Sequence, residues 1–383
     1  MRIAQIAPLA ESVPPKLYGG TERVVAWLVD ELVDLGHDVT LFASGDSRTR
    51  GKLHPAWPRA LRLARPAADP IAACTALLEA ISRRASEFDV IHAHIDWIHL
   101  PLLSRLGVPF VTTLHGRLDL PGLENVLRDF PDAPFVSISD HQRRPLHQAN
   151  WCGTVYHGLP ADLLCPSYQP GSYFAFLGRF TAEKGPEEAI RIAHTTGIPL
   201  RIAAKIPRGE RRYFKDRLEP QIDGTFIQLV GEVDDKAKGP FLAGAKALLF
   251  PIDWPEPFGL AMIEAMACGT PVIAFGRGSV PEVVDEGVTG FVVDSEEEAV
   301  AAVDRLEELD RRQVRARFEE RFTATRMAKE YVSHYQSLLA PAHKGPCSNL
   351  ISHARSSPCM PLVAQSATPL ELDVQKRPQN DLL

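Results

Sequence analysis

The sequence predicts an α/β protein with two doubly wound parallel sheets. Short apolar segments alternate with amphipathic helical segments along residues 1–340, and this alternation is typical of parallel strands joined by crossover helices. A chain of 383 residues is long enough for two domains, each with its own core. Its content of 45% hydrophobic and 23% charged residues is that of a globular protein.

Composition also narrows the classes of function. The 42 basic and 48 acidic residues give a net charge of −6, so there is no general reason to expect a nucleic acid partner. No apolar run approaches the roughly 20 residues that span a bilayer, and residues 1–7 fit a first strand better than a signal peptide. We therefore expect a cytoplasmic protein, and peripheral membrane contact through local basic clusters stays open.

The first third of the chain begins with a strand, helix and strand. Residues 2–7 and 39–42 are predicted strands, and residues 21–35 form a predicted helix that Thr21 caps. Before this helix, Gly19 and Gly20 provide either a flexible turn or bare amides that can approach a phosphate closely. Residues 41–69 are expected to form a long loop with helical fragments, followed by a helix at 70–87 and a strand at 88–91.

Histidines follow two of the next predicted strands. His92 and His94 stand at alternate positions after residue 91, but no third ligand follows at a suitable spacing, so a site wall is preferred to a metal site. The strand at 108–114 delivers His115 to its carboxyl end, where ligands of open α/β sheets bind. A lone histidine in that place is more often structural than catalytic. Two more strands are expected at 135–139 and 151–156.

The second half begins with a strand at 172–177 that leads into Arg179 and, five residues later, Lys184. Two cations at the rim of a sheet suit a diphosphate, although a solvated charged surface is the alternative. Further strands are predicted at 200–204, 226–230 and 247–250, with helices at 208–218, 236–243, 296–309, 311–322 and 325–339. Residues 341–383 are rich in Pro and Ser and lack aromatic residues, so we expect them to be disordered.

The stretch at 250–294 carries the densest pattern. A buried strand ends in a loop that holds Glu256 between two prolines, and a run of strong helix formers follows to residue 267. Glu264 lies eight residues after Glu256, about two helical turns on, so both carboxylates can face one crevice. Two solvated surface residues are the alternative. Free backbone amides at the start of this helix favour an anionic group, and they belong to Phe258, Gly259 and Leu260.

This segment resembles the Glu-x7-Glu signature of family 4 of the retaining glycosyltransferases, which have the GT-B fold and belong to the glycosyl transferases group 1. The PFGL turn, AMACGTPVIA and GSVPEVV…GVTGFVV follow the first glutamate in order. TLHG at 113–116 and GR…EKG at 178–185 extend the resemblance over both halves of the chain. The family usually has Asn-Gly where this chain has His157-Gly158, which leaves the role of His157 open.

The resemblance implies a role for each candidate residue. His115 and Glu256 are expected to act at the reacting sugar, and Glu264 to hold the ribose of the nucleotide. His94, Asp96 and Trp97 are expected on the acceptor side. The residues implied for the donor diphosphate are two basic side chains, two glycines of the first loop and the PFGL turn: Gly19, Gly20, Arg179, Lys184, Phe258, Gly259 and Leu260.

The resemblance also implies the reaction and the domains. It predicts a hexosyltransferase of carbohydrate biosynthesis that moves a hexose, with retention, from a UDP- or GDP-sugar to a hydroxyl of a saccharide, lipid-linked sugar or small molecule. Residues 1–160 would form the acceptor-side domain, completed by a helix at 325–340, and residues 161–324 the nucleotide-sugar domain. The chain has no Asp-x-Asp sequence to hold a metal-bound diphosphate, so we predict no metal requirement and no cofactor.

Three other functions are alternatives to a glycosyltransferase. A sugar phosphorylase on the same fold would use phosphate in place of a nucleotide sugar, and product analysis separates the two. A catalytically silent nucleotide-sugar-binding protein would be expected to have lost some of the candidate residues. A dinucleotide oxidoreductase would need a G-x-G-x-x-G turn in the first βα unit, and this chain has none there.

Overall fold

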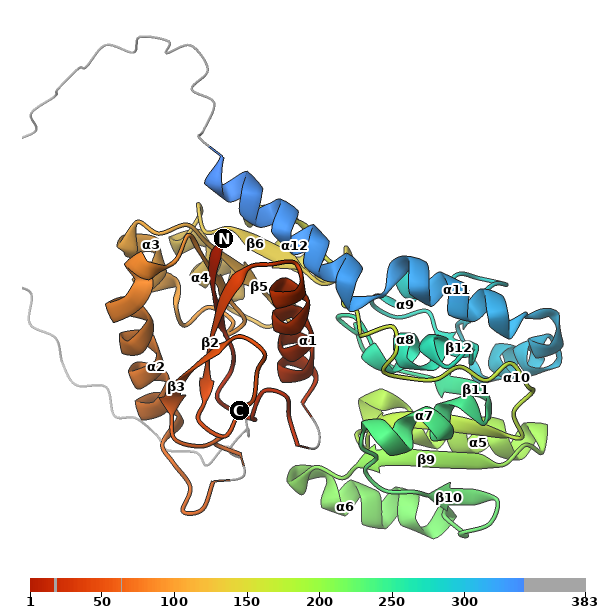
Figure 1. Ribbon diagram of the computed structural model, residues 1–383. Helices are drawn as coiled ribbons and strands as arrows, with labels where there is room; N and C mark the ends of the chain where they lie inside the picture. The colour runs from red at the N-terminus through yellow and green to blue at the C-terminus, as the bar shows by residue number, and fades with distance from the viewer. Residues whose placement is uncertain (17–18, 63, 341–383) are drawn as a thin grey trace, which may run out of the picture. The chain divides into compact units, whose positions relative to one another are not determined.

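The computed structural model describes residues 1–16, 19–62 and 64–340. The expectation of disorder for residues 341–383 lies outside these described residues. Two parallel sheets organise the chain between Arg2 and Val293 (Figure 1). None of the helices in the described part is both long and apolar enough to cross a membrane.

The first sheet has seven parallel strands in the order β3-β2-β1-β4-β5-β6-β7. Its order reverses beside β1, so the carboxyl ends of β1 and β4 open onto the point where ligands of such sheets bind. The strands are β1 (Arg2–Ile6), β2 (Asp38–Ser44), β3 (Lys52–Trp57), β4 (Val90–Ala93), β5 (Phe110–Thr113), β6 (Phe135–Ser137) and β7 (Trp151–Thr154).

Helices cover both faces of the first sheet, because alternate residues of each strand join different cores. Ile3 packs in a core with α1 and α12, whereas Ala4 packs in a core with α2, α3 and α4. Helix α12 also contacts α1 (Figure 1). The bounds are α1 (Gly20–Asp34), α2 (Pro70–Arg84), α3 (Leu100–Leu106), α4 (Leu123–Asp129), α12 (Ala324–Leu339) and the 3₁₀ turns Ala85–Glu87 and Arg144–Leu146.

The second sheet has six parallel strands in the order β10-β9-β8-β11-β12-β13. Its central strands are almost wholly buried and read as continuous apolar runs, which is typical of parallel sheets covered on both faces. The strands are β8 (Tyr173–Arg179), β9 (Leu200–Lys205), β10 (Ile227–Leu229), β11 (Ala245–Phe250), β12 (Val272–Phe275) and β13 (Gly290–Val293).

The second sheet also has helices on both faces. Phe174 packs in a core with α5 and α10, whereas Ala175 shares the larger core with α7, α8 and α11. The helices are α5 (Pro186–Thr196), α6 (Arg211–Tyr213), α7 (Asp235–Ala243), α8 (Leu260–Ala267), α9 (Val280–Val283), α10 (Glu296–Asp304) and α11 (Arg311–Arg321). A π-helical turn follows α6 at Phe214–Leu218, and 3₁₀ turns occur at Ala182–Lys184, Arg208–Glu210, Glu219–Gln221 and Leu306–Glu308.

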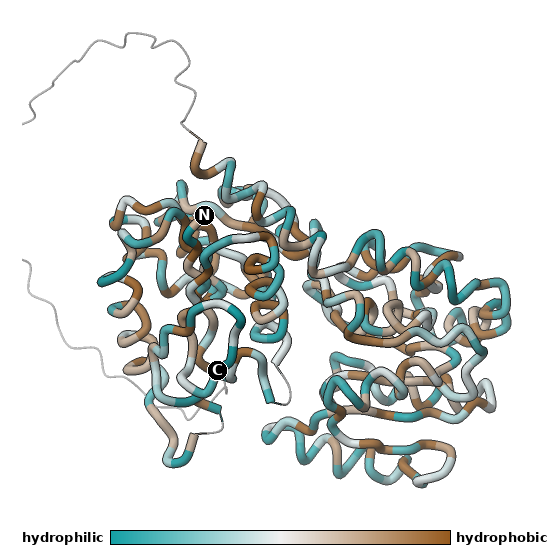
Figure 2. Tube along the Cα trace, viewed as in Figure 1, coloured by the Kyte–Doolittle hydropathy of each residue, from teal (hydrophilic) through white to brown (hydrophobic). Residues whose placement is uncertain are grey.

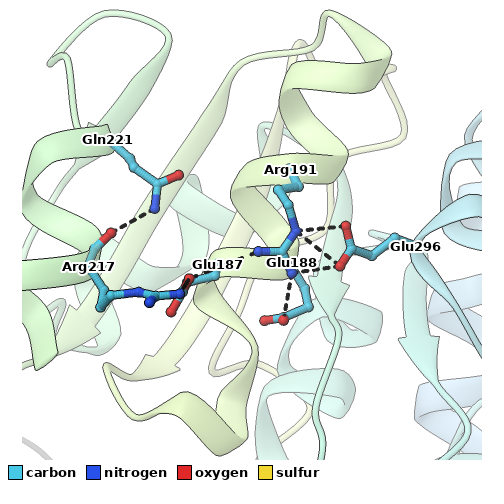
Figure 3. Close-up of polar contacts among 6 residues, drawn as sticks. All are labelled: Glu187, Glu188, Arg191, Arg217, Gln221 and Glu296. Atoms are coloured by element: carbon cyan, nitrogen blue, oxygen red, sulfur yellow. Dashed lines mark hydrogen bonds and ion pairs between the residues drawn. The ribbon is translucent and has the colours of Figure 1, made fainter.

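Surface ion pairs join three of these segments (Figure 3). The Arg191 guanidinium of α5 lies 2.6 Å from Glu296 of α10 and 2.7 Å from Glu188. Arg217 lies 3.0 Å from Glu187, so the turn after α6 is tied to the same helix. Because Arg191 is about half exposed, we ascribe most of the stability of this layer to the apolar contacts beneath it.

Figure 2 shows apolar residues along the strands and alternating polar and apolar residues along α12.

Two local expectations were wrong. Residues 41–69 contain an edge strand, β3, which pairs with β2. Its half-exposed pattern and Pro55 give little strand signal in the sequence. Helix α1 begins at Gly20, and Gly19, in an extended conformation, occupies the N-cap position without any side-chain cap from Thr21.

Candidate active site

A buried ion pair joins the proline loop to the turn that follows β8. The Glu256 carboxylate pairs with the Lys184 ammonium and accepts a hydrogen bond of 2.8 Å from Trp254 Nε1. Glu256 is only 9% exposed, so it is not the solvated loop residue of the alternative interpretation. The Lys184 nitrogen also lies 4.2 Å from the centre of the Trp254 indole ring, a cation–π distance.

Arg179 and Lys184 act on each other electrostatically. Burial lowers the pKa of Lys184, Glu256 counters that effect, and the positive charge of Arg179 lowers the pKa further. The Arg179 guanidinium lies 3.3 Å from Glu183, and its Nε is buried with no hydrogen-bond partner among the described residues. Two neighbouring cations, one with an unsatisfied donor, are suited to receive an anion.

The PFGL turn depends on a glycine with a left-handed conformation. Gly259 has φ +83°, and a Cβ atom there would lie 2.6 Å from Met262 Cε and 3.2 Å from Phe250 Cζ. Helix α8 starts at the next residue, Leu260. A Cβ atom built on Gly20 would lie 3.6 Å from Leu260 Cδ1, so the structure brings the first glycine loop and this helix start together.

Glu264 is buried in α8 against a lysine of α7. Its carboxylate lies 2.6 Å from the Lys238 ammonium, and the two side chains are 7% and 8% exposed. Lys238 also lies 3.4 Å from Asp235, which pairs with Arg23 of α1. Glu264 is therefore buried, and the alternative interpretation of an exposed helix residue is wrong. An ordered carboxylate in this place can accept hydrogen bonds from ligand hydroxyls.

His115 follows β5 and reaches the PFGL turn through a second histidine. Its ring stacks on His157 with 5.2 Å between ring centres, and the His157 and Phe258 rings form a T-shaped contact with 5.0 Å between ring centres. His115 Nε2 lies 2.9 Å from His94 Nδ1. Burial lowers the pKa of His115 to about 3, so the imidazole is neutral at neutral pH.

The three residues expected on the acceptor side differ in their surroundings. His94 is 3% exposed, and its two nitrogens contact Gln5 and His115, so it lies beneath His115 rather than on a surface. Asp96 is exposed and has φ +53°, a rare conformation for a residue other than glycine. Trp97 is half-buried and packs against the core under α4.

Gly19 was predicted from the sequence, and three other residues of the candidate site were not. A Cβ atom on Gly19 would lie 2.8 Å from Pro15 Cβ, so Gly19 packs closely against Pro15. Trp254 and Lys238, which hold the two glutamates, and Gln5, which holds His94, were not predicted. The sequence held a signal for the burial of Lys238, because it precedes Phe241 and Leu242 by three and four residues and shares their buried helix face.

Within the described ranges, no group of three or more His, Cys, Asp or Glu residues is arranged to hold a metal ion.

Two family models match adjoining parts of the chain. The model described as Glycosyltransferase Family 4 matches residues 18–168, and the model described as Glycosyl transferases group 1 matches residues 166–324. Together they span most of both sheets.

Among curated relatives, the phosphatidyl-myo-inositol mannosyltransferase of Mycolicibacterium smegmatis is 28% identical over 346 residues, covering 80% of this chain and 85% of the relative. The D-inositol 3-phosphate glycosyltransferase of Mycolicibacterium gilvum is 25% identical over 259 residues, covering 55% of this chain and 56% of the relative.

Solved structures show the same fold. AviGT4, a glycosyltransferase involved in avilamycin A biosynthesis, is 26% identical with a TM-score of 0.68, covering 89% of this chain and 98% of that one. HepE of Anabaena, solved with UDP and glucose, is 18% identical with a TM-score of 0.68 over 88% of this chain and all of its own. The predicted GT-B fold, family and enzyme class, a retaining hexosyltransferase, are thus confirmed. The chain belongs to the family 4 glycosyltransferases of group 1, enzymes that transfer a sugar from a nucleotide sugar.

Proposed function

We propose that this enzyme moves a hexose from a UDP- or GDP-sugar to a hydroxyl acceptor, with retention and without a metal ion. The observation that carries the proposal is the buried contact that Glu256, in the loop that leads into α8, makes with Lys184 and Trp254. It places a carboxylate that can bind sugar hydroxyls beside a cation that can bind phosphate. In this proposal, residues 161–324 hold the donor, and residues 1–160 with the helix at 325–340 receive the acceptor.

The donor diphosphate would meet fixed positive charge. Departure of a nucleoside diphosphate builds negative charge on its terminal phosphate, and preorganised cations and amides stabilise such charge. Arg179 and Lys184 would supply the cations. The backbone amides at the start of α8 and the glycine loop before α1 would supply donors at two helix ends, and these residues are Gly19, Gly20, Phe258, Gly259 and Leu260.

The remaining candidates would divide the sugar, the ribose and the acceptor. Glu256 and His115 would bind hydroxyls of the hexose, and Glu264, ordered by Lys238, would bind the ribose hydroxyls. Asp96 and Trp97 would lie toward the acceptor. Both curated relatives are named for inositol-containing substrates, so myo-inositol and inositol phosphates are suitable first acceptors to test.

A thermal-shift panel tests the proposal. UDP, GDP, ADP and inorganic phosphate would be compared with and without EDTA, and the matching nucleotide sugar would then be incubated with each acceptor. We expect UDP or GDP to raise Tm equally in both conditions, and the product to keep the anomeric configuration of the donor. A protein that responds to no nucleoside diphosphate, or that cleaves a disaccharide only with phosphate, would contradict the proposal.

A further inference from the structure

A chain of buried hydrogen bonds lies beneath His115. The amide oxygen of Gln5, in β1, lies 2.8 Å from His94 Nε2, and His94 Nδ1 lies 2.9 Å from His115 Nε2. The amide nitrogen of Gln5 donates to the Tyr335 hydroxyl of α12 at 3.0 Å. Gln5 and Tyr335 are fully buried and His94 nearly so. The sequence alone showed Gln5 only as a polar residue in an apolar strand.

The direction of each hydrogen bond follows from the orientation of the Gln5 amide, whose oxygen faces His94 and whose nitrogen faces Tyr335. An amide oxygen only accepts, so the proton of His94 is on Nε2. Burial lowers the pKa of His94 well below 6.5, with a smaller effect from neighbouring histidines, so this ring is neutral and its Nδ1 is an acceptor. His115 Nε2 must then donate to it. Because His115 is neutral as well, its Nδ1 carries a lone pair and no proton.

The other end of the chain agrees with this direction. Tyr335 accepts from the Gln5 amide nitrogen and can donate to His92 Nδ1, which lies 2.7 Å away. His92 Nε2 then donates to Thr113 Oγ1 at 2.8 Å, and Thr113 lies 2.9 Å from the Tyr331 hydroxyl. The buried side-chain polar atoms of Gln5, His94, Tyr335, His92 and Thr113 thus each have a partner of the right kind.

Within this network the lone pair of His115 Nδ1 is the exception, and outside it the Nδ1 atoms of His99 and His157 are likewise buried without a partner among the described residues. The atom is buried and has no hydrogen-bond partner among the described residues, and His157 covers one face of the ring. Leaving a buried acceptor unpaired is unfavourable, and a ligand that donates a hydrogen bond to Nδ1 would remove that penalty. A sugar hydroxyl is such a donor.

Building on the proposed function, we propose that Gln5 and His94 are positioning residues that hold His115 as the Nε2–H tautomer, with Nδ1 as the acceptor for a hydroxyl of the donor hexose. His115 is then a hydrogen-bond acceptor for the sugar and not a proton donor to it. The lone pair orients the hydroxyl. Because the tautomer is fixed before the donor binds, no free energy is lost in selecting it during binding.

Nitrogen-15 NMR of the histidine-labelled, full-length protein tests the tautomer without any ligand. The His115 signals are assigned by their loss in His115→Ala. We expect a proton-bearing Nε2 and a bare Nδ1 at pH 7.5 in the wild type, and a substantial population of the other tautomer in Gln5→Leu. Thr112→Val is the matched control, because it breaks one buried hydrogen bond to His99 in the same sheet and should leave His115 unchanged. A proton on Nδ1 in the wild type, or an unchanged His115 in Gln5→Leu, would overturn the proposal.

Kinetics tests the role of the tautomer. With UDP-glucose or GDP-mannose, whichever nucleotide the thermal-shift panel selects, Gln5→Leu should lower kcat roughly ten- to hundredfold, whereas the Kd of the free nucleoside diphosphate changes less than about twofold. Thr112→Val should retain kcat. If the wild type has the expected tautomer but turns over no nucleotide sugar, the positioning by Gln5 stands, and the assignment to a sugar hydroxyl fails together with the proposed function.

Discussion

At Glu256 and Glu264, a carboxylate is buried against a lysine from a different element. Lys184 comes from the turn after β8 and Lys238 from α7, so each glutamate is held by a residue distant in sequence. Removing one partner of a buried ion pair leaves an uncompensated charge and typically costs about 3–5 kcal/mol. Substitutions to Gln or Met keep the size of the side chain but also remove its charge, so the stability of each variant is measured beside its function.

The two glutamates are predicted to have separable roles. Glu264→Gln should raise the Kd of UDP or GDP about tenfold, because a neutral amide binds ribose hydroxyls less strongly than a carboxylate. Glu256→Gln should leave that Kd within about twofold and lower kcat about a hundredfold, because the proposal assigns Glu256 to the sugar. Calorimetry of nucleotide binding and initial rates with the nucleotide sugar measure the two effects.

Lys238→Met tests the same assignment through the lysine that holds Glu264. The variant leaves the Glu264 carboxylate without its lysine, so nucleotide binding should weaken although the carboxylate is retained. An equal loss of nucleotide binding and turnover in Glu264→Gln and Glu256→Gln would contradict the division of roles.

Residue identities were predictable where a motif carried them. Glu256 and Glu264 belong to a spacing that strand, loop and helix signals surround, so their candidacy follows from the sequence. Lys238 is 26 residues from Glu264 in the chain, and Gln5 is 89 residues from His94. Such pairs depend on which strands and helices become neighbours, which no local pattern specifies. The acceptor-side roles of Asp96 and Trp97 stay predictions.

Among the elements, the proline loop owes its position to a glycine that follows β12. Gly278 has φ +61°, and a Cβ atom there would lie 2.3 Å from Glu256 N and 2.4 Å from Glu256 O. Gly287 has φ +70° but no atom within 4 Å of a built Cβ. Both glycines therefore have a left-handed backbone conformation, but only Gly278 has other atoms close to the position of a Cβ.

Gly278→Ala is predicted to displace Glu256, whereas Gly287→Ala is not. Both should lower the free energy of unfolding by about 1 kcal/mol for the left-handed backbone, and Gly278→Ala by roughly 1–3 kcal/mol more for the clash. Turnover of the nucleotide sugar should fall at least about tenfold in Gly278→Ala alone. Thermal unfolding and initial rates of the two variants measure this, and equal turnover would count against a role for Gly278 in placing the loop.

Element types were predicted best where burial makes the pattern strong. The central strands β1, β5, β8 and β11 are buried on both faces, so their apolar runs stand out in the sequence. Strand β3 lies at the sheet edge and was missed, because edge strands need not be apolar. The start of α1 was misplaced because Gly19 provides no side-chain cap, and neighbouring contacts position the helix instead.

Across the whole molecule, the first sheet and α12 enclose neutral histidines. His92 and His99 are fully buried, and His94 and His157 nearly so. Burial lowers the pKa of each, that of His99 to about 3. The first sheet and α12 were predicted from periodicity and resemblance, but the histidine cluster was not, because its members come from several elements. The division into domains near residue 160 stays a prediction.

These histidines predict that stability falls steeply in mild acid. Between the native pKa, about 3 for His99, and the unfolded value near 6.5, the unfolded chain binds protons that the native chain does not. The free energy of unfolding therefore rises with pH across this window and is lost as pH falls below about 6.5, at about 1.4 kcal/mol per pH unit for each such histidine. Chemical denaturation at pH 7.5, 6.0 and 5.0 measures the slope.

His99→Gln isolates one member of the cluster. Glutamine does not titrate and can still donate to Thr112, the hydrogen-bond partner of His99. The variant should therefore lose some stability at pH 7.5 from altered packing but reduce the slope between pH 6.0 and 5.0 by about 1.4 kcal/mol per pH unit. His147→Gln, at an exposed position after β6, is the control and should leave the slope unchanged. If His99→Gln and the wild type lose stability in parallel, His99 is protonated in the native state and cannot be a source of the acid sensitivity.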